Sequence, residues 1–364
     1  MEIEIQIGKR LRQARLMKKM SLEELSDSLG DNGISKQALC KYESGEVSQN
    51  EEVLKKLSAV LGVEMDFFYR PINFDIEATK VEFRKKKMSE KDVNALKMQI
   101  QDDIENYIEV DRLLNGGKKN SVRARLKPAG IVSKPSEAEE FAGEVRKEWQ
   151  LGESGISNVY ALIESAGIAI IETKGPESFD GVSGETDEAE MIIVMNQELS
   201  GGVERRRFTA MHELGHLLMQ SHIDEELTPS KVEKLCHAFA SEMLLPTSAL
   251  RQEVEGKPSI GNQDLINIQC AFGISTDAIM LKLNALGIVS DSYYRTYQIK
   301  KKRSPKYARY MEQTRYMETK PDKMREMVYR AVMMELMTYD KAAQMLGEDE
   351  EMVMSEVGDR IRLR

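Results

Sequence analysis

This chain of 364 residues has few cysteines, no long apolar run and no net positive charge, and each of these features excludes something. The 3 cysteines, Cys40, Cys236 and Cys270, are far apart and form no C-x-x-C pair, which indicates a reducing compartment. No apolar run is long enough to span a bilayer, and the opening M-E-I-E-I-Q lacks a signal-peptide core. The net charge of −9 does not predict nucleic-acid binding, so such binding has to come from a local patch. We therefore expect a cytoplasmic protein with no membrane segment.

Histidine is nearly as scarce as cysteine, and its distribution is informative. The 4 histidines all lie between His212 and His237, which suggests one local task. Residues 209–219 read T-A-M-H-E-L-G-H-L-L-M and contain the pattern H-E-x-x-H. With histidine this rare, a chance match anywhere in the chain is expected well under about one per cent of the time.

The H-E-x-x-H spacing predicts a zinc site on a helix. His212 and His216 are one helical turn apart, so both imidazoles can reach the same ion. Glu213 points about 100° to the side, where it can accept a proton from a water without being a ligand. Zinc lowers the pKa of a bound water to about 7, which makes it a nucleophile for a polarised carbonyl. The pattern therefore predicts peptide hydrolysis with Glu213 as the general base.

Two histidines are too few ligands for a zinc site, and three residues are candidates for the third ligand. Glu233 and Glu242 lie on the helix expected downstream, with Glu233 favoured. His222 has the spacing of the extended H-E-x-x-H-x-x-G-x-x-H motif, but Met219 stands where that motif needs a glycine to turn the chain. His237 is expected either to orient a ligand or to be an ordinary core histidine.

Several motifs around this site, in order, resemble the ImmA/IrrE family of metallopeptidases. They are R-F-T-A-M-H-E-L-G-H-L-L, then E-x-x-C-H-x-F-A-x-x-L-L-x-P, with D-G-V-S-G and I-I-V-M-N before them and G-I-S-T-D-A-I-M-L-K-L-N-A-L-G-I-V after them. The resemblance covers roughly residues 135–295. It implies a Zn²⁺-dependent endopeptidase that cleaves repressor or antitoxin-like proteins, with His212, His216 and Glu233 as ligands and Glu213 as the catalytic residue. Such families usually have Asn or Asp where His237 stands.

The beginning of the chain resembles a different family, the Xre-like helix-turn-helix domains of phage repressors. The matching segments within residues 8–69 are I-G-K-R-L-R-Q-A-R, S-L-E-E-L-S-D-S-L-G and S-K-Q-A-L-C-K-Y-E-S-G. The third segment corresponds to the recognition helix, whose first turns enter the major groove. The turn L-G-D-N-G-I-S before it looks longer than usual.

The resemblance places five residues against double-stranded DNA. Lys36, Gln37 and Lys41 are expected on the outward face of the recognition helix, where Gln can pair with adenine and Lys with guanine. Arg12 and Arg15 belong to a basic cluster that is expected to contact backbone phosphates. The family further suggests a homodimer on a near-palindromic operator. Residues 1–70 are not basic overall, so a helix-turn-helix that contacts only protein is the alternative.

Together these patterns predict a multidomain protein that is mostly α, with an α+β zincin-like part and a small β-sheet. We expect a DNA-binding transcriptional regulator that cleaves a partner protein, or itself, in response to a signal. The alternatives are a regulator whose zinc domain only senses or dimerises, and an antitoxin-like protein that acts by binding. The expected parts are a helix-turn-helix domain at 1–70, a helical linker with a hinge at 71–130, a zinc metallopeptidase-like domain at 131–255, and a helical region with helix-turn-helix-like pieces at 256–364.

Overall fold

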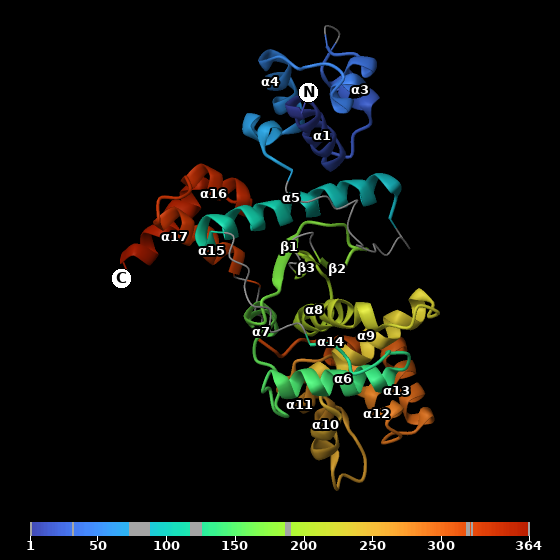
Figure 1. Ribbon diagram of the computed structural model, residues 1–364. Helices are drawn as coiled ribbons and strands as arrows, with labels where there is room; N and C mark the ends of the chain where they lie inside the picture. The colour runs from blue at the N-terminus through green and yellow to red at the C-terminus, as the bar shows by residue number, and fades with distance from the viewer. Residues whose placement is uncertain are drawn as a thin grey trace. The chain divides into compact units, whose positions relative to one another are not determined.

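The chain is mostly helical, as the computed structural model in Figure 1 shows. In the described part, seventeen α-helices accompany one small three-stranded sheet, which confirms the expected fold class. The chain forms two compact units, one of Met1–Lys118, Thr173–Ser178 and Met324–Arg364, and the other of Lys119–Glu172 and Phe179–Lys323. The structure describes residues 2–30, 33–72, 88–116, 126–185, 191–317, 321 and 323–362.

Five short helices at the beginning of the first unit form a helix-turn-helix fold. Their starts follow the sequence signals: Ser21 and Glu24 form the expected capping box, and Ser35 caps the third helix by accepting a hydrogen bond from the Ala38 amide. Leucines of the first four helices, with Phe67 and Phe68 of the 3₁₀ turn, close one core. The elements are α1 (Glu2–Met17), α2 (Leu22–Ser28), α3 (Lys36–Ser44), α4 (Glu51–Leu61) and η1 (Met65–Tyr69).

The long helix α5 (Glu90–Asn115) packs against this fold rather than standing apart as a connector. The buried guanidinium of Arg10 donates to Glu105 of α5 at 2.5 Å and also to main-chain carbonyls of Arg70 and Pro71. Half of the residues of α5 are buried. The expected hinge after α5, at 115–120, lies mostly outside the described residues.

Three helices at the end of the chain belong to the same unit as the helix-turn-helix fold. The pair formed by α16 and α17 turns at Gly347, which has φ 63°. Gly62, after Leu61, and Gly273, after Phe272, have φ of 64° and 62° and end helices in the same way. Glycine suits all three positions because a left-handed backbone is strained for other residues. The three terminal helices are α15 (Lys323–Met333), α16 (Tyr339–Leu346) and α17 (Glu350–Arg362).

The second unit places a small sheet beside a helical layer. The strands β1 (Ala169–Thr173), β2 (Gly181–Glu185) and β3 (Met191–Asn196) have the order β1-β3-β2, and β2 is antiparallel to β3 with Val182 opposite Val194. The apolar runs I-A-I-I-E (168–172) and M-I-I-V-M-N (191–196) predict β1 and β3, whereas the sequence of β2 has no such run. The helices are α6 (Pro135–Glu148), α7 (Val159–Ser165), α8 (Gly202–Met219), η2 (Gln220–His222), α9 (Pro229–Leu244), α10 (Thr247–Val254), α11 (Asn262–Phe272), α12 (Thr276–Ala285), α13 (Asp291–Arg303) and α14 (Pro305–Glu312).

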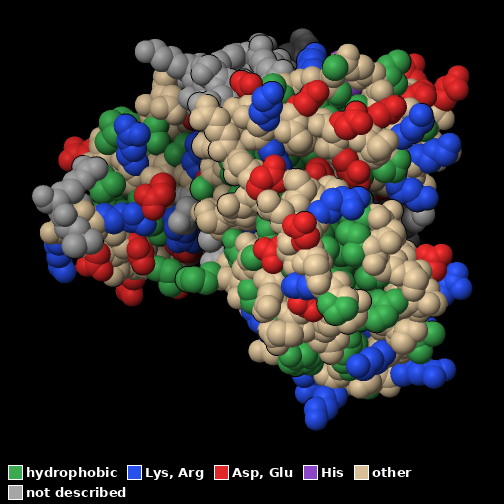
Figure 2. All heavy atoms as spheres, turned by 90° about the horizontal axis from the view of Figure 1, so that it is seen from below, with side chains coloured by type: hydrophobic (Ala, Val, Ile, Leu, Met, Phe, Trp, Pro, Cys, Tyr) green, Lys and Arg blue, Asp and Glu red, His purple; other side chains and the backbone are tan. Residues whose placement is uncertain are grey.

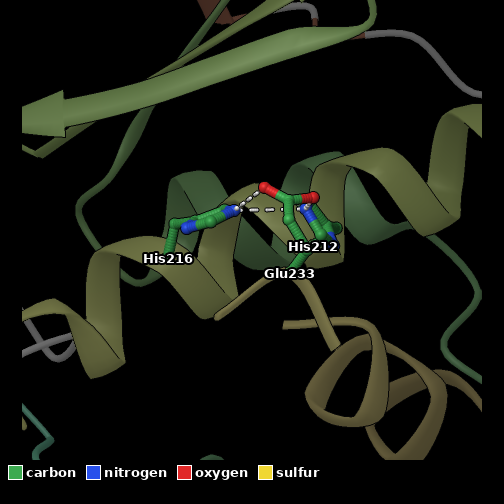
Figure 3. A group of neighbouring side chains, drawn as sticks. All are labelled: His212, His216 and Glu233. Atoms are coloured by element: carbon green, nitrogen blue, oxygen red, sulfur yellow. Dashed lines mark hydrogen bonds and ion pairs between the residues drawn. The ribbon is translucent and has the colours of Figure 1, made fainter. Parts of the chain in front are cut away.

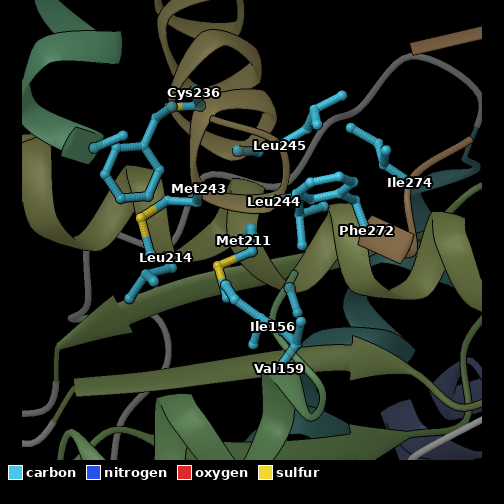
Figure 4. Packing of buried hydrophobic residues seen from close by; sticks show 14 of the residues in the cluster. Ile156, Val159, Met211, Leu214, Cys236, Met243, Leu244, Leu245, Phe272 and Ile274 are labelled. Carbon is cyan, nitrogen blue, oxygen red and sulfur yellow. The ribbon is translucent and has the colours of Figure 1, made fainter. Parts of the chain in front are cut away.

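One large hydrophobic cluster holds the second unit together, and α9 lies in it between α6 and α8. Figure 4 shows Met211 and Leu214 of α8 meeting Met243 of α9, with Phe272 and Ile274 beside them. Because both α8 and α9 are fixed by this core, side chains on their facing surfaces are held in register.

The surface carries both signs of charge. On the face drawn in Figure 2, Lys and Arg side chains are interspersed with Asp and Glu side chains and with apolar patches. Among the described helices, none is both long and apolar enough to cross a membrane.

Candidate metal centre

Three potential ligands meet where α8 crosses α9. His212 and His216 are one turn apart on α8, and Glu233 extends from α9 between their rings, as Figure 3 shows. The Nε2 atoms of the two histidines are 3.2 Å apart, and they lie 3.4 and 3.5 Å from the two carboxylate oxygens of Glu233. One ligand atom from each residue falls within 4.8 Å of the others. Two imidazoles and a carboxylate are a donor set that fits zinc.

The three side chains differ in their access to solvent. His212 is buried, with 3% of its surface exposed, whereas the His216 and Glu233 side chains are 27% and 30% exposed. The cluster is therefore anchored from inside and open on one side. A site with three protein ligands and one open side suits a catalytic metal better than a closed structural one.

Glu213 contacts the sheet and is not one of the three residues of the ligand cluster. Its carboxylate accepts a hydrogen bond from the Ser183 hydroxyl of β2 at 3.0 Å, and only 5% of the residue is exposed. Gly181 of β2 lets the strand come this close, because a Cβ there would lie 3.3 Å from Glu213 Cγ and 3.3 Å from Thr209 Cγ2. Ser183 thus fixes the direction of the carboxylate that the sequence assigns to general-base chemistry.

Gly215 explains how α9 comes so near to α8. A Cβ at this position would lie 3.0 Å from the ring of Phe239 and 3.5 Å from the Cα of Cys236. The absent side chain therefore serves the packing of α9, which carries Glu233. Room for substrate, the other role considered for Gly215, is not what this contact indicates.

The electrostatics of the cluster depend on the carboxylates and on a thiol. Burial lowers the pKa of His216, whereas hydrogen bonds with Cys236 and Glu233 raise it. The resulting pKa is about 10. Burial raises the pKa of the Cys236 thiol, so this cysteine is neutral near pH 7.

The two other residues considered as third ligands lie elsewhere. The Glu242 carboxylate forms a buried ion pair with Lys282 at 2.5 Å and accepts hydrogen bonds from the amide and hydroxyl of Thr247. His222 lies in η2, where its main-chain carbonyl accepts a hydrogen bond from Val132. Glu233 is the one of the three that the described structure brings to His212 and His216.

His237 lies beside the cluster, but it is not a core histidine. Its side chain is exposed, and its ring centroid is 4.7 Å from that of His212 and 5.7 Å from that of Phe208. The ring therefore flanks a ligand from the solvent side.

The residues expected to bind DNA divide into two groups. Lys36, Gln37 and Lys41 are exposed on α3, and Arg12 is exposed on α1. Arg15 instead is buried and donates to both carboxylate oxygens of Glu43, at 2.6 and 2.8 Å. The expectation that Arg15 contacts phosphate does not match this geometry, because its guanidinium is used inside the fold.

Sequence reasoning missed two contacts that shape the metal centre. Neither the hydrogen bond from Ser183 to Glu213 nor that between Cys236 and His216 was expected. Ser183 and Cys236 do lie within motifs that carry the family resemblance, D-G-V-S-G and E-x-x-C-H. The spacing of residues within a motif does not show, however, which residues of different motifs meet.

Comparison with known families agrees with the two halves of this description. Residues 163–284 match the model of the IrrE N-terminal-like domain, the M78 peptidase family, and residues 11–68 match the helix-turn-helix model. No curated protein matches the chain. The first match includes all three residues of the ligand cluster, and the second includes the exposed face of α3.

Proposed function

We propose that this chain, which joins an Xre-type helix-turn-helix domain to an IrrE-like domain of the M78 peptidases, is a DNA-binding regulator that hydrolyses a partner protein or itself. The observation that supports hydrolysis is that neighbouring residues of α8 make different contacts. His212 and His216 converge with Glu233, while Glu213 between them in sequence is held apart by Ser183. A purely structural metal site has no use for such a carboxylate.

The ligand cluster fits a zinc ion held by His212, His216 and Glu233. When bound, zinc supplies a water of lowered pKa and a Lewis acid for the scissile carbonyl. Glu213 accepts the proton of the attacking water and donates it to the leaving amine. Because Glu213 is almost fully buried and hydrogen-bonded to Ser183, its carboxylate is positioned before substrate arrives.

The sheet offers a way to hold the substrate. β2 is an edge strand in the order β1-β3-β2, and in the described part of the chain its ladder partner is β3. An edge strand can pair with an extended peptide through main-chain hydrogen bonds. Since Ser183 of β2 contacts Glu213, a peptide on this edge would run next to the general base. We therefore propose an extended segment of a repressor or antitoxin-like protein as the substrate.

The helix-turn-helix domain provides the second half of the function. Lys36, Gln37 and Lys41 present donors and an acceptor on the exposed face of α3, and we propose that they read operator bases. Arg12 contacts the backbone, and two copies of the chain bind a near-palindromic site. Cleavage of the partner then changes the activity of a regulated promoter.

The test compares Glu213→Gln with wild type in a proteolysis assay against the proteins encoded beside this one and against the chain itself. Zinc content and folding should stay near wild type because all three ligands remain. Cleavage should fall by about 10²–10⁴-fold, and a chelator should abolish it in the wild type. Glu225→Gln, an exposed carboxylate outside the site, is the matched control and should cleave normally. Undiminished cleavage by Glu213→Gln, or a protein that takes up no zinc, would refute the hydrolytic proposal.

A further inference from the structure

The segment from Ser292 to Met311 is the most uniformly basic part of a chain whose net charge is −9. Its twenty residues include seven Lys or Arg and no Asp or Glu. The segment covers almost all of α13 and α14, which lie together in the second unit (Figure 1). Acidic residues make up 61 of the 364 positions, so about three would be expected in a segment of this length.

Three of the five positive charges of α13 share one side of the helix. With about 100° between successive residues, Arg295, Ile299, Lys302 and Arg303 fall on one face of the helix, and all four are exposed. The buried Tyr297 lies on the opposite side. On α14, Lys306 and Arg309 are exposed as well.

Most of these charges lack a counter-charge from the protein. Lys301 is the exception, since it pairs with Asp277 at 2.5 Å and with Glu312 at 3.2 Å. Among the described residues, no carboxylate lies within 4.0 Å of the amino or guanidinium groups of Lys302, Arg303 or Lys306. The exposed cations Lys55 and Lys56 of α4 and Lys91 of α5 are instead paired with Glu. The basic face of α13 and α14 is therefore a local positive field.

The tyrosines of this segment help to identify its partner. Single-stranded nucleic acids are typically held by aromatic rings that are free to stack on bases. Here Tyr293 donates to the Ile260 carbonyl, Tyr297 donates to Asp277 at 2.9 Å, and Tyr307 donates to Asn262 at 2.8 Å. Arg315 covers the ring of Tyr310. These contacts tie each of the four side chains to the protein, although Tyr293 and Tyr310 keep 42% and 45% of their surface exposed.

We propose that the basic face of α13 and α14 is a second DNA-binding surface, which contacts the phosphate backbone of duplex DNA without reading its sequence. A face of unpaired cations with engaged tyrosines has the chemistry of phosphate contact and lacks that of base readout. The surface belongs to the unit that carries the metal centre, whereas the operator-reading helix belongs to the other unit. The chain therefore contacts DNA through both units, and the second contact raises the affinity of the first by increasing its effective concentration. This inference does not depend on proteolysis.

The test measures binding of the full chain to a duplex of arbitrary sequence between 50 and 200 mM salt by fluorescence anisotropy. The variant K302Q/R303Q/K306Q removes three exposed cations that have no partner in the described structure. Each phosphate contact contributes about 0.9 to the slope of log affinity against log salt, so the slope should become shallower by about 2–3. The matched control K147Q/K231Q/R251Q removes the same charge from exposed positions on α6, α9 and α10 and should keep the wild-type slope.

Four outcomes would overturn the proposal. These are an unchanged slope in the first variant, an equal loss in the control, tighter binding of single-stranded RNA or DNA than of duplex, and displacement of duplex by polyglutamate as readily as by DNA of equal charge. The first variant should also retain the wild-type thermal melting temperature and rate of partner cleavage, which shows that its fold and metal centre are intact. Loss of cleavage by Glu213→Gln bears on the peptidase alone, so the two proposals fail independently.

Discussion

At the scale of single residues, Glu233 and Glu242 show how two acids on one helix acquire different tasks. Both extend from α9, but Glu233 faces α8 and its histidines while Glu242 faces α12 and Lys282. Burial lowers the pKa of the Lys282 ammonium, and the nearby Glu242 carboxylate partly opposes this effect. Glu242 thus stabilises a buried charge, whereas Glu233 is available to a metal.

We predict that alanine at these two positions separates metal binding from stability. Glu233→Ala should lose most zinc, as measured by metal analysis of the purified protein, and should fold without it. Glu242→Ala should keep about one zinc per chain but lose about 3–5 kcal/mol of unfolding free energy, because it leaves Lys282 buried without its partner. Glu51→Ala removes an exposed ion pair with Lys55 and should leave the stability close to that of the wild type. Loss of zinc in Glu242→Ala alone would reverse the assignment of the third ligand.

The two histidines could be predicted from sequence because both lie within one turn of a single helix, where spacing determines geometry. The hydrogen bond between Ser183 and Glu213 joins positions 30 residues apart, and no local rule connects them. The same reason explains the misassigned Arg15: its partner Glu43 is 28 residues away, so an apparently free cation is in fact paired inside the fold.

At the scale of elements, α5 shows what helical periodicity predicts and what it leaves out. The N-cap residue Ser89 and the apolar positions that follow it predict the helix. Periodicity does not reveal that polar residues such as Gln101 and Glu105 would also be buried, since this depends on Arg10 of a distant helix. β2 was missed for a related reason, because a short edge strand with two glycines has neither the apolar run nor the alternation of a typical strand.

The carboxyl of Asp103 on α5 should make stability depend on pH. Burial raises its pKa to about 7, helped by the neighbouring Asp102 and opposed by a hydrogen bond from Gln99. The folded state then retains a proton that an unfolded chain releases near pH 4. Between these values the folded state binds more protons, so this group lowers the unfolding free energy as pH rises from about 4 to about 7.

We predict that Asp103→Asn removes this dependence. In urea unfolding at pH 8, the variant should be more stable than wild type, and the difference should shrink as the pH is lowered toward 4.5. Glu46→Gln, at an exposed position in the same unit, should follow the wild-type curve within about 0.5 kcal/mol at each pH. If Asp103→Asn were less stable than wild type at pH 8, the carboxylate would be favoured in the folded state and the argument would be wrong.

At the scale of the whole molecule, the chain folds into two compact units. The sequence predicts both domains because each carries several motifs in order. The domain ranges expected from the sequence differ, however, from the ranges of the two compact units. The expected linker helix and the last three helices belong to the unit of the helix-turn-helix, which no local pattern could show because the segments are far apart in sequence. Since the face of α3 and the metal ligands lie in separate units, variants of one should leave the other intact.

The last prediction uses this separation to distinguish a peptidase from a sensor. Gln37→Ala should cleave the partner at the wild-type rate but lose about 1–3 kcal/mol of preference for one operator base pair, measured by binding to altered operators. Glu213→Gln should bind the operator as wild type does, leave the partner intact, and hold the regulated promoter in its uninduced state in cells. The double variant should show both defects, with binding energies that add within about 0.5 kcal/mol. A Glu213→Gln strain whose promoter still responds normally to its signal would show that turnover is not the mechanism. The zinc domain would then act as a sensor, because its ligands are untouched while its general base is gone.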